Sequence, residues 1–282
     1  MAMTVALLNM KGGVGKSTLA VNLVWEYSTS PWHMKVLLVD LDPQFNASQY
    51  LLGQADYVKA VLVKAHPTVW DIFEQNTKAP GRVSTASFDA HSALLTVQMF
   101  PSTGGQIDLI ASRLELALSL RNPAQKETLL ARSVSQIAAD YDLIVIDCPP
   151  TESVLTSAAY LASDQILVPV KPEYLSSIGL PLLRQSLNDF GNDNPSKMLH
   201  VAGIVFNATT GYSPEELKAK AEVSALARSY KWPVFASEVP YSRSFPKGAR
   251  EGMPIFLTSY ARTTTASRFQ GFAREFAKAV GL

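Results

Sequence analysis

The most constraining feature of this sequence is a glycine-rich segment that lies between an apolar run and a helical pattern. Val5–Asn9 is apolar and of strand length, residues 11–18 read KGGVGKST, and Ser17–Tyr27 has the composition of a helix. Glycines let backbone N–H groups turn inward around phosphate oxygens, and the start of the following helix adds positive potential. A strand, a glycine loop and a helix in this order predict a phosphate-binding site for a nucleotide.

Every residue of this loop is a candidate nucleotide contact. The candidates are Lys11, Gly12, Gly13, Val14, Gly15, Lys16, Ser17 and Thr18. Lys16 is placed to bridge the β- and γ-phosphates, and the Ser17 hydroxyl is placed to bind Mg²⁺. Met10 stands where the common motif has its first glycine, and Lys11 is an additional lysine. Because one phosphate loop has no evident need for two lysines, we expect one of them to serve a second nucleotide.

Short apolar runs alternate with helical stretches along most of the chain. The runs of strand length are Val5–Asn9, Val36–Asp40, Leu143–Asp147, Ile166–Val170 and Val201–Asn207. The helical stretches include Ser17–Tyr27, Pro123–Asp140, Ser153–Ala162 and Pro214–Tyr230. Apolar runs of this kind suit strands that are buried on both faces. The alternation predicts an α/β fold with a doubly wound, mostly parallel sheet and helices on both faces.

We expect the whole chain, residues 1–282, to form a single domain. Residues 53–112 are less regular. Within them, Ala93–Phe100 and Ile107–Ala111 flank a turn sequence and predict two strands, and His66–Gln75 predicts a short helix. Because no long linker sets this region apart, we interpret it as an elaboration of the same domain.

Composition excludes several classes of protein. The chain has 282 residues, of which 47% are hydrophobic, enough for a full core and too many for a disordered chain. Cys148 is the only cysteine, which excludes disulfide frameworks and metal centres held by the cysteines of one chain. No apolar run reaches the roughly 18 residues of a membrane-spanning helix, and the start lacks a basic secretory segment. We therefore expect a cytoplasmic protein.

Two further segments place carboxylates at the ends of apolar strands. Val36–Asp40 continues as LDPQFNAS, which contains Asp42, and Leu143–Asp147 continues as CPP. Together with the loop, these segments resemble the ParA/MinD family of deviant Walker A ATPases, which are P-loop NTPases of the nitrogenase-iron-protein-like type. The resemblance implies that Asp42 orients or activates the attacking water. It also implies that Asp40 lies in the outer shell of Mg²⁺ and that Asp147 holds Mg²⁺ through water.

The same resemblance implies how the chain assembles around ATP. In that family two chains sandwich two nucleotides face to face, and Lys11 would reach the ATP of the partner. Lys11, Lys16 and Mg²⁺ would then stabilise the charge that develops on the phosphates during in-line attack by water. Asn207 ends a strand where the family presents an adenine-reading residue, and Pro240 would pack on the adenine ring.

The charge distribution adds a candidate partner. Net charge is +1, but residues 203–282 carry 11 lysines and arginines against 6 acidic residues, whereas residues 1–202 carry 14 against 18. A basic C-terminal third favours a polyanion, which in a ParA-type protein is nonspecific DNA bound through its phosphates. The candidate DNA contacts are Arg243, Lys247, Arg250, Arg262, Arg268 and Arg274. Solvated charges or pairs within the chain are the alternative interpretation.

Other branches of the family fit the sequence less well. Iron–sulfur members need at least two cysteines at defined positions, and Cys148 is the only cysteine of this sequence. A MinD-like protein needs an amphipathic anchor with a basic face, whereas the helix predicted from Thr265 to Val280 carries Glu275 on its polar face and is expected to pack on the core.

We therefore expect a ParA-type ATPase, cytoplasmic and nucleoid-associated, that segregates or positions a plasmid, a chromosome or another cargo. Its cofactors would be ATP and Mg²⁺, and its partners a second copy of the chain, nonspecific DNA and a ParB-like or cargo-adaptor protein that stimulates slow hydrolysis. The alternatives are a MinD-like ATPase at a membrane surface and a nucleotide-gated scaffold with negligible catalysis.

Overall fold

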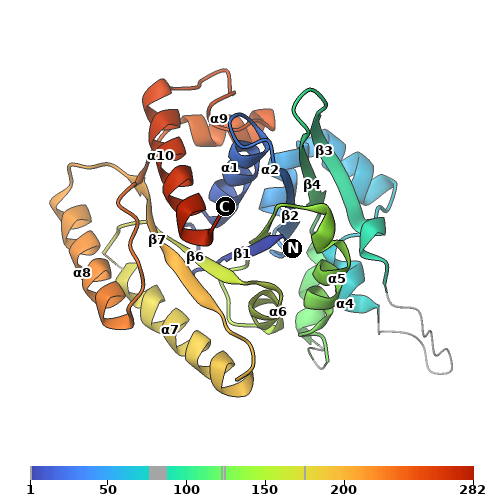
Figure 1. Cartoon of the computed structure of the whole chain (residues 1–282), viewed down its shortest axis with the longest axis horizontal. Helices are drawn as coiled ribbons and strands as arrows, with labels where there is room; N and C mark the ends of the chain where they lie inside the picture. Colours follow the sequence, from blue (N-terminus) through green and yellow to red (C-terminus); the bar gives the residue numbers. More distant parts are fainter. Residues whose placement is uncertain (1, 76–87, 122, 124, 175) are drawn as a thin grey trace.

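The computed structural model describes residues 2–75, 88–121, 123, 125–174 and 176–282. An eight-stranded sheet with the order β3-β4-β2-β5-β1-β6-β7-β8 runs through the middle of the molecule (Figure 1). Its strands are β1 (Met3–Leu7), β2 (Lys35–Asp40), β3 (Leu94–Phe100), β4 (Gly105–Ile110), β5 (Leu143–Asp147), β6 (Gln165–Val170), β7 (His200–Thr209) and β8 (Val239–Pro240). The β3 strand pairs antiparallel with β4, and the other pairings of these strands are parallel. The predicted mostly parallel α/β sheet is confirmed.

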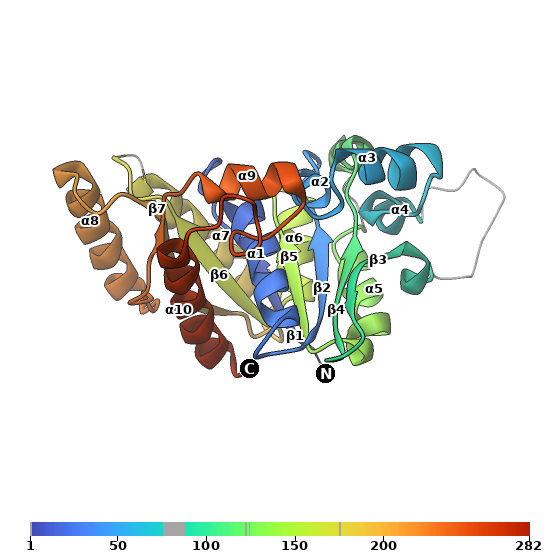
Figure 2. The ribbon, with the colours of Figure 1, turned by 90° about the horizontal axis from the view of Figure 1, so that it is seen from above.

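Helices cover both faces of the sheet (Figures 1 and 2). One face carries α1 (Lys16–Ser28), α2 (Asn46–Leu52), α3 (Gln54–Tyr57), the π-helical η1 (Val58–Val63) and α10 (Thr263–Val280). The other face carries α4 (Val69–Glu74), α5 (Leu129–Ile137), α6 (Val154–Ala162), α7 (Ser176–Asp193) and α8 (Pro214–Tyr230). Short 3-10 segments are η2 (Ala90–Ala93), η3 (Leu114–Arg121) and η4 (Ala138–Asp140).

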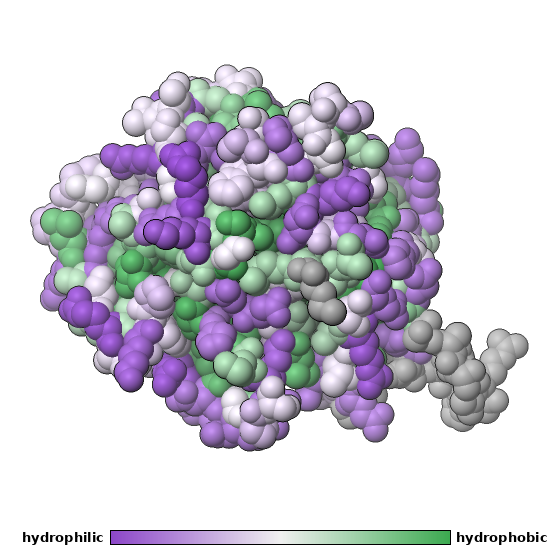
Figure 3. Space-filling view, viewed as in Figure 1, coloured by the Kyte–Doolittle hydropathy of each residue, from purple (hydrophilic) through white to green (hydrophobic). Residues whose placement is uncertain are grey.

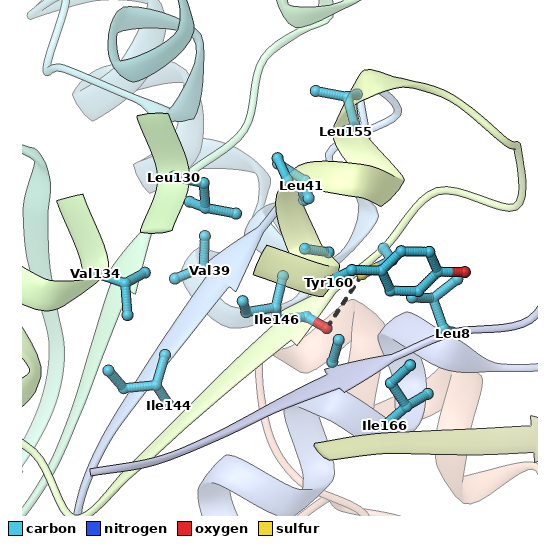
Figure 4. Close-up of a cluster of buried hydrophobic side chains, with 14 of the residues drawn as sticks. Leu8, Val39, Leu41, Leu130, Val134, Ile144, Ile146, Leu155, Tyr160 and Ile166 are labelled. Carbon is cyan, nitrogen blue, oxygen red and sulfur yellow. Dashed lines mark hydrogen bonds between the residues drawn. The ribbon is translucent and has the colours of Figure 1, made fainter. Parts of the chain in front are cut away.

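Each face of the sheet packs against its own apolar cluster. Figure 4 shows the cluster beneath α5 and α6, where Val39 and Ile146 of neighbouring strands face Leu130 and Tyr160 of the helices. All four side chains are almost completely buried. Burial on both faces explains why the central strands are continuous apolar runs rather than alternating ones.

The second cluster contains the apolar face of the last helix. Phe269, Phe272 and Phe276 of α10 are 0% exposed, and Phe235 packs edge-to-face on the last two of them. The Tyr27 hydroxyl of α1 donates a hydrogen bond of 2.6 Å to the carbonyl of Ala273 in α10. The last helix therefore packs on the core, as the spacing of its apolar residues predicted.

The region 53–112 contributes both helices and an edge of the sheet. The two predicted strands form β3 and β4, which extend the sheet, and the short helix predicted at His66–Gln75 is α4. Thr68 begins α4 with a capping box, in which its side chain and that of Asp71 each bond the other's backbone. Residues 76–87 lie outside the described residues.

One predicted helix is shorter than its sequence pattern. The stretch Pro123–Asp140 predicted a helix throughout, but α5 begins at Leu129. Before it, Lys126 turns inward and its ammonium lies 2.6 Å from a carboxylate oxygen of Glu74 in α4. The predicted helix therefore begins later than its pattern indicated, and Lys126 in the segment before it forms a long-range ion pair. Residue 124 lies outside the described residues.

The carboxyl ends of the central strands meet at one edge of the sheet. Asp40 at the end of β2 is in register with Asp147 at the end of β5, which in turn pairs with Leu7 of β1. The short helix α9 (Ser244–Glu251) crosses this edge, and both termini lie at the opposite edge (Figure 2). In open α/β sheets, ligands bind outside the carboxyl ends of the strands. This edge is therefore where a site is expected.

Candidate functional site

The glycine-rich loop joins β1 to α1 and is fixed at its beginning and end. The side chain of Asn9 accepts a hydrogen bond of 2.9 Å from the backbone N–H of Lys11 and donates one of 2.8 Å to the carbonyl of Pro169 at the end of β6. Gly15 precedes the first turn of α1 with a φ of +89°, which favours glycine. The loop is thereby held open at the start of a helix, a geometry suited to anions.

A cavity of about 700 Å³ opens in front of this loop. It is lined by residues 12–18, Asp42, Gln44, Asn46, Gln49, Tyr50, Gln54 and Pro150, and by Ala249 and Arg250 of α9. Its size lies within the range of small-molecule and cofactor sites. The cavity brings together the loop, the segment after β2 and α9, which are far apart in the sequence.

Lys16 lies beneath the loop, at the first position of α1. Its ammonium is buried and donates to the carbonyl of Asn9 at 3.2 Å and to that of Lys11 at 3.4 Å. Burial lowers the pKa of Lys16, and the carboxylates of Asp147 and Asp42 oppose that shift. The cation is therefore fixed at the base of the loop, where bound phosphate would supply negative charge.

Asp147 is fully buried beside Ser17, and its carboxylate has few interactions with other side chains. Neither of its carboxylate oxygens has a hydrogen bond of normal geometry within the described residues. Burial, followed by the charge of Asp40, raises the pKa of Asp147 well above its usual value, whereas the Ser17 hydroxyl and Lys16 favour its charged form. A buried carboxylate without a partner, close to a hydroxyl, has the donor chemistry of a cation site.

These residues fit Mg²⁺ when it is bound together with a phosphate. No cluster of three His, Cys, Asp or Glu side chains occurs in the part of the chain that the structure describes. Mg²⁺ commonly takes one or two carboxylates, waters and the phosphates of its substrate. Ser17 and Asp147 have the donor chemistry for the protein share of such a set, and their predicted role in holding Mg²⁺ stays a prediction.

Asp40 positions the segment that carries Asp42. One oxygen of Asp40 accepts hydrogen bonds from the backbone N–H and the hydroxyl of Ser48, at 2.8 and 2.6 Å, and the other accepts one of 3.2 Å from the N–H of Asp42. Burial raises the pKa of Asp40 to about 7, and the bonds from Ser48 oppose the shift. Its oxygens therefore hold the first turn of α2, and its outer-shell role toward Mg²⁺ stays a prediction.

Asp42 lies in the wall of the cavity, where it is 7% exposed. One of its oxygens accepts a hydrogen bond of 2.9 Å from the backbone N–H of Gln44. The carboxylate is thereby oriented in the same cavity as the loop. Its predicted role toward the attacking water stays a prediction.

Lys11 points away from this cavity to a partner in its own chain. Its ammonium lies 3.2 Å from a carboxylate oxygen of Glu173, in the segment between β6 and α7. Glu173 also pairs with Lys171. Lys11 is 26% and Glu173 45% exposed, so the pair is accessible to solvent. The predicted contact of Lys11 with a second nucleotide stays a prediction.

Asn207, in β7, is hydrogen-bonded to the phosphate loop. Its amide nitrogen donates a hydrogen bond of 2.8 Å to the carbonyl of Val14, and a Cβ at Gly15 would overlap that nitrogen. Part of its hydrogen-bonding capacity is thus used inside the protein, and neither Asn207 nor Pro240 lines the 700 Å³ cavity. Their predicted adenine contacts stay predictions.

The candidate DNA contacts differ in the interactions that their side chains make. Lys247 pairs with Glu251 at 3.1 Å, Arg262 lies over the ring of Tyr260, and Arg274 is electrostatically linked to buried Glu26. Arg250 lines the cavity. Arg243 and Arg268 are exposed, and their side chains have no ion pair or hydrogen bond within the described residues.

The amides and the tyrosine of the cavity wall were missed in the sequence. Asn46, Gln49 and Tyr50 lie at helical spacing, three and four residues apart, directly after the Asp42 segment. Such spacing places them on one face of a helix. A polar face that starts at a candidate catalytic carboxylate is the signal that could have identified them.

Fold and site together define a P-loop nucleotide-binding protein. A family model described as an AAA domain (AAA_31) matches residues 2–199. The chromosome partitioning protein ParA of Myxococcus xanthus is 30% identical over 253 residues, which cover 90% of this chain and 80% of that protein. The chromosome-partitioning ATPase Soj of Treponema pallidum is 29% identical over 276 residues, with 98% and 97% covered.

Solved structures agree on the fold. The structure of a plasmid partition protein from Borrelia burgdorferi B31 bound to AMPPNP matches with a TM-score of 0.73 and 22% identity, covering 99% of each chain. The chain thus belongs to the ParA/MinD family of deviant Walker A P-loop ATPases. The family membership predicted from the loop and the two carboxylate segments is confirmed.

Proposed function

We propose that this chain is a single-domain, Mg²⁺-dependent ATPase that closes into a dimer around two ATP molecules, binds nonspecific DNA and positions a cargo along the nucleoid. A ParB-like or adaptor partner would stimulate its slow hydrolysis and release it. The observation that carries the catalytic part is the cavity in which the phosphate loop, buried Lys16 and Asp42 meet. The partition proteins among its relatives, one of them bound to AMPPNP, support the nucleotide and the role.

The residues of the cavity have separate tasks in this proposal. The N–H groups of residues 12–16 bind phosphate oxygens, and Lys16 holds the β- and γ-phosphates. Ser17 and Asp147 hold Mg²⁺, which neutralises phosphate charge when bound. Asp42 aligns a water molecule that attacks the γ-phosphorus as the bond to the bridging oxygen breaks, giving ADP and phosphate.

The dimer part of the proposal requires the Lys11 side chain to leave its ion pair with Glu173 of the same chain. Its present partner, Glu173, is 45% exposed and shared with Lys171. An exposed ion pair of this kind contributes about 0–1 kcal/mol. Exchange of that pair for a triphosphate of a second subunit therefore costs little, which supports the role of Lys11 across an interface.

The DNA part rests on exposed positive charge. Arg243 and Arg268 have no partner among the described residues, and both lie in the basic C-terminal third. Binding through phosphates needs accessible cations more than fixed geometry. These two side chains are therefore the first DNA contacts to test.

A membrane-surface function is less well supported. The apolar face of α10 is buried, since Phe269, Phe272 and Phe276 are 0% exposed. No helix in the described part of the chain has the length and hydropathy to cross a membrane. Seen from the side of Figure 1, hydrophobic side chains form small patches among hydrophilic ones (Figure 3). An amphipathic anchor would need a broad apolar face free of the core.

The experiment that tests the catalytic proposal is phosphate release by Asp42→Ala, with Asp193→Asn as a matched control on an exposed carboxylate at the end of α7. We expect Asp42→Ala to release phosphate about 100-fold more slowly, because a positioned base contributes 10²–10⁴-fold. It should also accumulate as an ATP-bound dimer in size-exclusion chromatography.

Wild-type turnover in Asp42→Ala would refute the assignment of the water-orienting residue. Absence of phosphate release from the wild-type protein with Mg²⁺-ATP, DNA and cell extract would instead favour the nucleotide-gated scaffold.

A further inference from the structure

The helix α9 crosses the carboxyl edge of the sheet and places one cation in the lining of the cavity. Of its basic residues Lys247 and Arg250, the second lines the 700 Å³ cavity together with residues 12–18. The sequence alone grouped Arg250 with the exposed charges of the C-terminal third. Its position in the fold separates it from them.

A buried network fixes α9 in this place. The amide nitrogen of Asn22 in α1 donates a hydrogen bond of 3.2 Å to the hydroxyl of Tyr50 in α2, and its amide oxygen accepts one of 2.8 Å from the N–H of Ile255. A Cβ at Gly248 would lie 2.7 Å from the Tyr50 hydroxyl and 2.5 Å from the carbonyl of Met253. The backbone of α9 therefore packs directly on the helix that follows Asp42.

Arg250 has no partner of its own chain among the described residues. The acidic group next to it, Glu251, pairs with Lys247 at 3.1 Å and accepts a hydrogen bond of 2.8 Å from the backbone N–H of Ser259. The neighbouring carboxylate is thus occupied elsewhere. Arg250 is exposed and lines the same cavity as the loop.

The cavity is therefore lined by two cations from different elements. Lys16 lies at the start of α1 and Arg250 on α9, and the lining also contains Asp42, Gln44, Asn46, Gln49 and Gln54. A guanidinium keeps its charge at any physiological pH and offers several donors in a planar fork that matches phosphate oxygens. A triphosphate held by the loop is the anion that such a pair of cations would accommodate.

We propose that Arg250 contacts the phosphate groups of the nucleoside triphosphate bound to the same subunit. It then acts as a cation supplied in cis from α9, and it does not belong to the DNA-binding set. The inference rests on the proposed nucleotide function. It adds a residue that neither the loop motif nor the two carboxylate segments contain.

The test is a comparison of nucleotide affinity among wild-type protein, Arg250→Ala, Arg250→Lys and Arg132→Ala. Arg132 is an exposed arginine of α5, outside the cavity, and is the matched control. Binding of AMPPNP with Mg²⁺ is measured by calorimetry, and affinity for a random-sequence DNA duplex is measured in parallel. Thermal unfolding without nucleotide checks that each variant is folded.

We expect Arg250→Ala to bind AMPPNP about tenfold more weakly, Arg250→Lys to recover part of the loss, and Arg132→Ala to match the wild type. A loss of less than threefold in Arg250→Ala would overturn the inference, whatever happens to DNA binding. Failure of the wild-type protein to bind AMPPNP would instead refute the proposed function, so the two failures are distinguishable.

Discussion

Charged side chains at the phosphate loop and those of the basic C-terminal third are held in opposite ways. At the loop, Lys16, Asp40 and Asp147 are buried and surrounded by defined groups. In the C-terminal third, Arg243 and Arg268 are exposed without a partner in the described chain. The first arrangement holds each ionisable group inside the protein, whereas the second leaves it in contact with water.

This difference indicates what each region can do. A buried charge costs free energy unless a ligand or partner compensates it, so each one has an individual task. Exposed charges are screened over about 10 Å at 0.1 M salt, so they act by their number and tolerate substitution. Substitutions at the loop should therefore have large, specific effects, and those on the surface small, cumulative ones.

The largest effect is expected for Lys16→Ala. The variant loses the buried ammonium that would meet the phosphates, and hydrogen bonds to charged groups contribute about 1.5–3 kcal/mol each. We predict at least a 100-fold loss of ATP affinity, measured by calorimetry with Mg²⁺. The control is Lys64→Ala, at an exposed lysine outside the cavity. Equal loss in both variants would break the distinction between buried and exposed charges.

An intermediate effect is expected for Glu173→Gln, which removes the partner of Lys11. Because an exposed ion pair contributes about 0–1 kcal/mol, the ATP concentration at half-dimerisation should fall about two- to fivefold. Analytical ultracentrifugation across an ATP titration measures this midpoint, with Glu127→Gln, at an exposed glutamate, as control. An unchanged midpoint would show that the pair does not restrain Lys11.

The smallest effects are expected for Arg243→Ala and Arg268→Ala. Each should weaken DNA binding a few-fold, equally for all sequences, and reduce the slope of log affinity against log salt by about 1. Fluorescence anisotropy at several salt concentrations measures both, with Arg132→Ala, at an exposed arginine of α5 outside the basic C-terminal third, as control. A loss that depends on DNA sequence, or a salt slope that does not change, would contradict the surface-charge interpretation.

Much of the fold was predictable because its signals are local. The boundaries predicted for β5 (Leu143–Asp147) and α8 (Pro214–Tyr230) match the structure, and the loop lies between β1 and α1 as predicted. Apolar periodicity, helix starts and glycine turns depend on residues within a few positions of one another. The phosphate loop and its two carboxylate segments could therefore be found without coordinates.

The tertiary structure decided which distant groups meet at the site. Only the order of the strands brings Asn207 to Val14, Glu173 to Lys11 and Arg250 to the cavity of the loop. Composition assigned Arg250 to a basic surface, because charge counts contain no information about which edge of the sheet a helix crosses. The sequence by itself determined the kind of loop and sheet, since both arise from short-range chemistry. The partners of the charged groups were decided by packing between distant segments, as in the pair of Lys11 and Glu173, which are 162 residues apart.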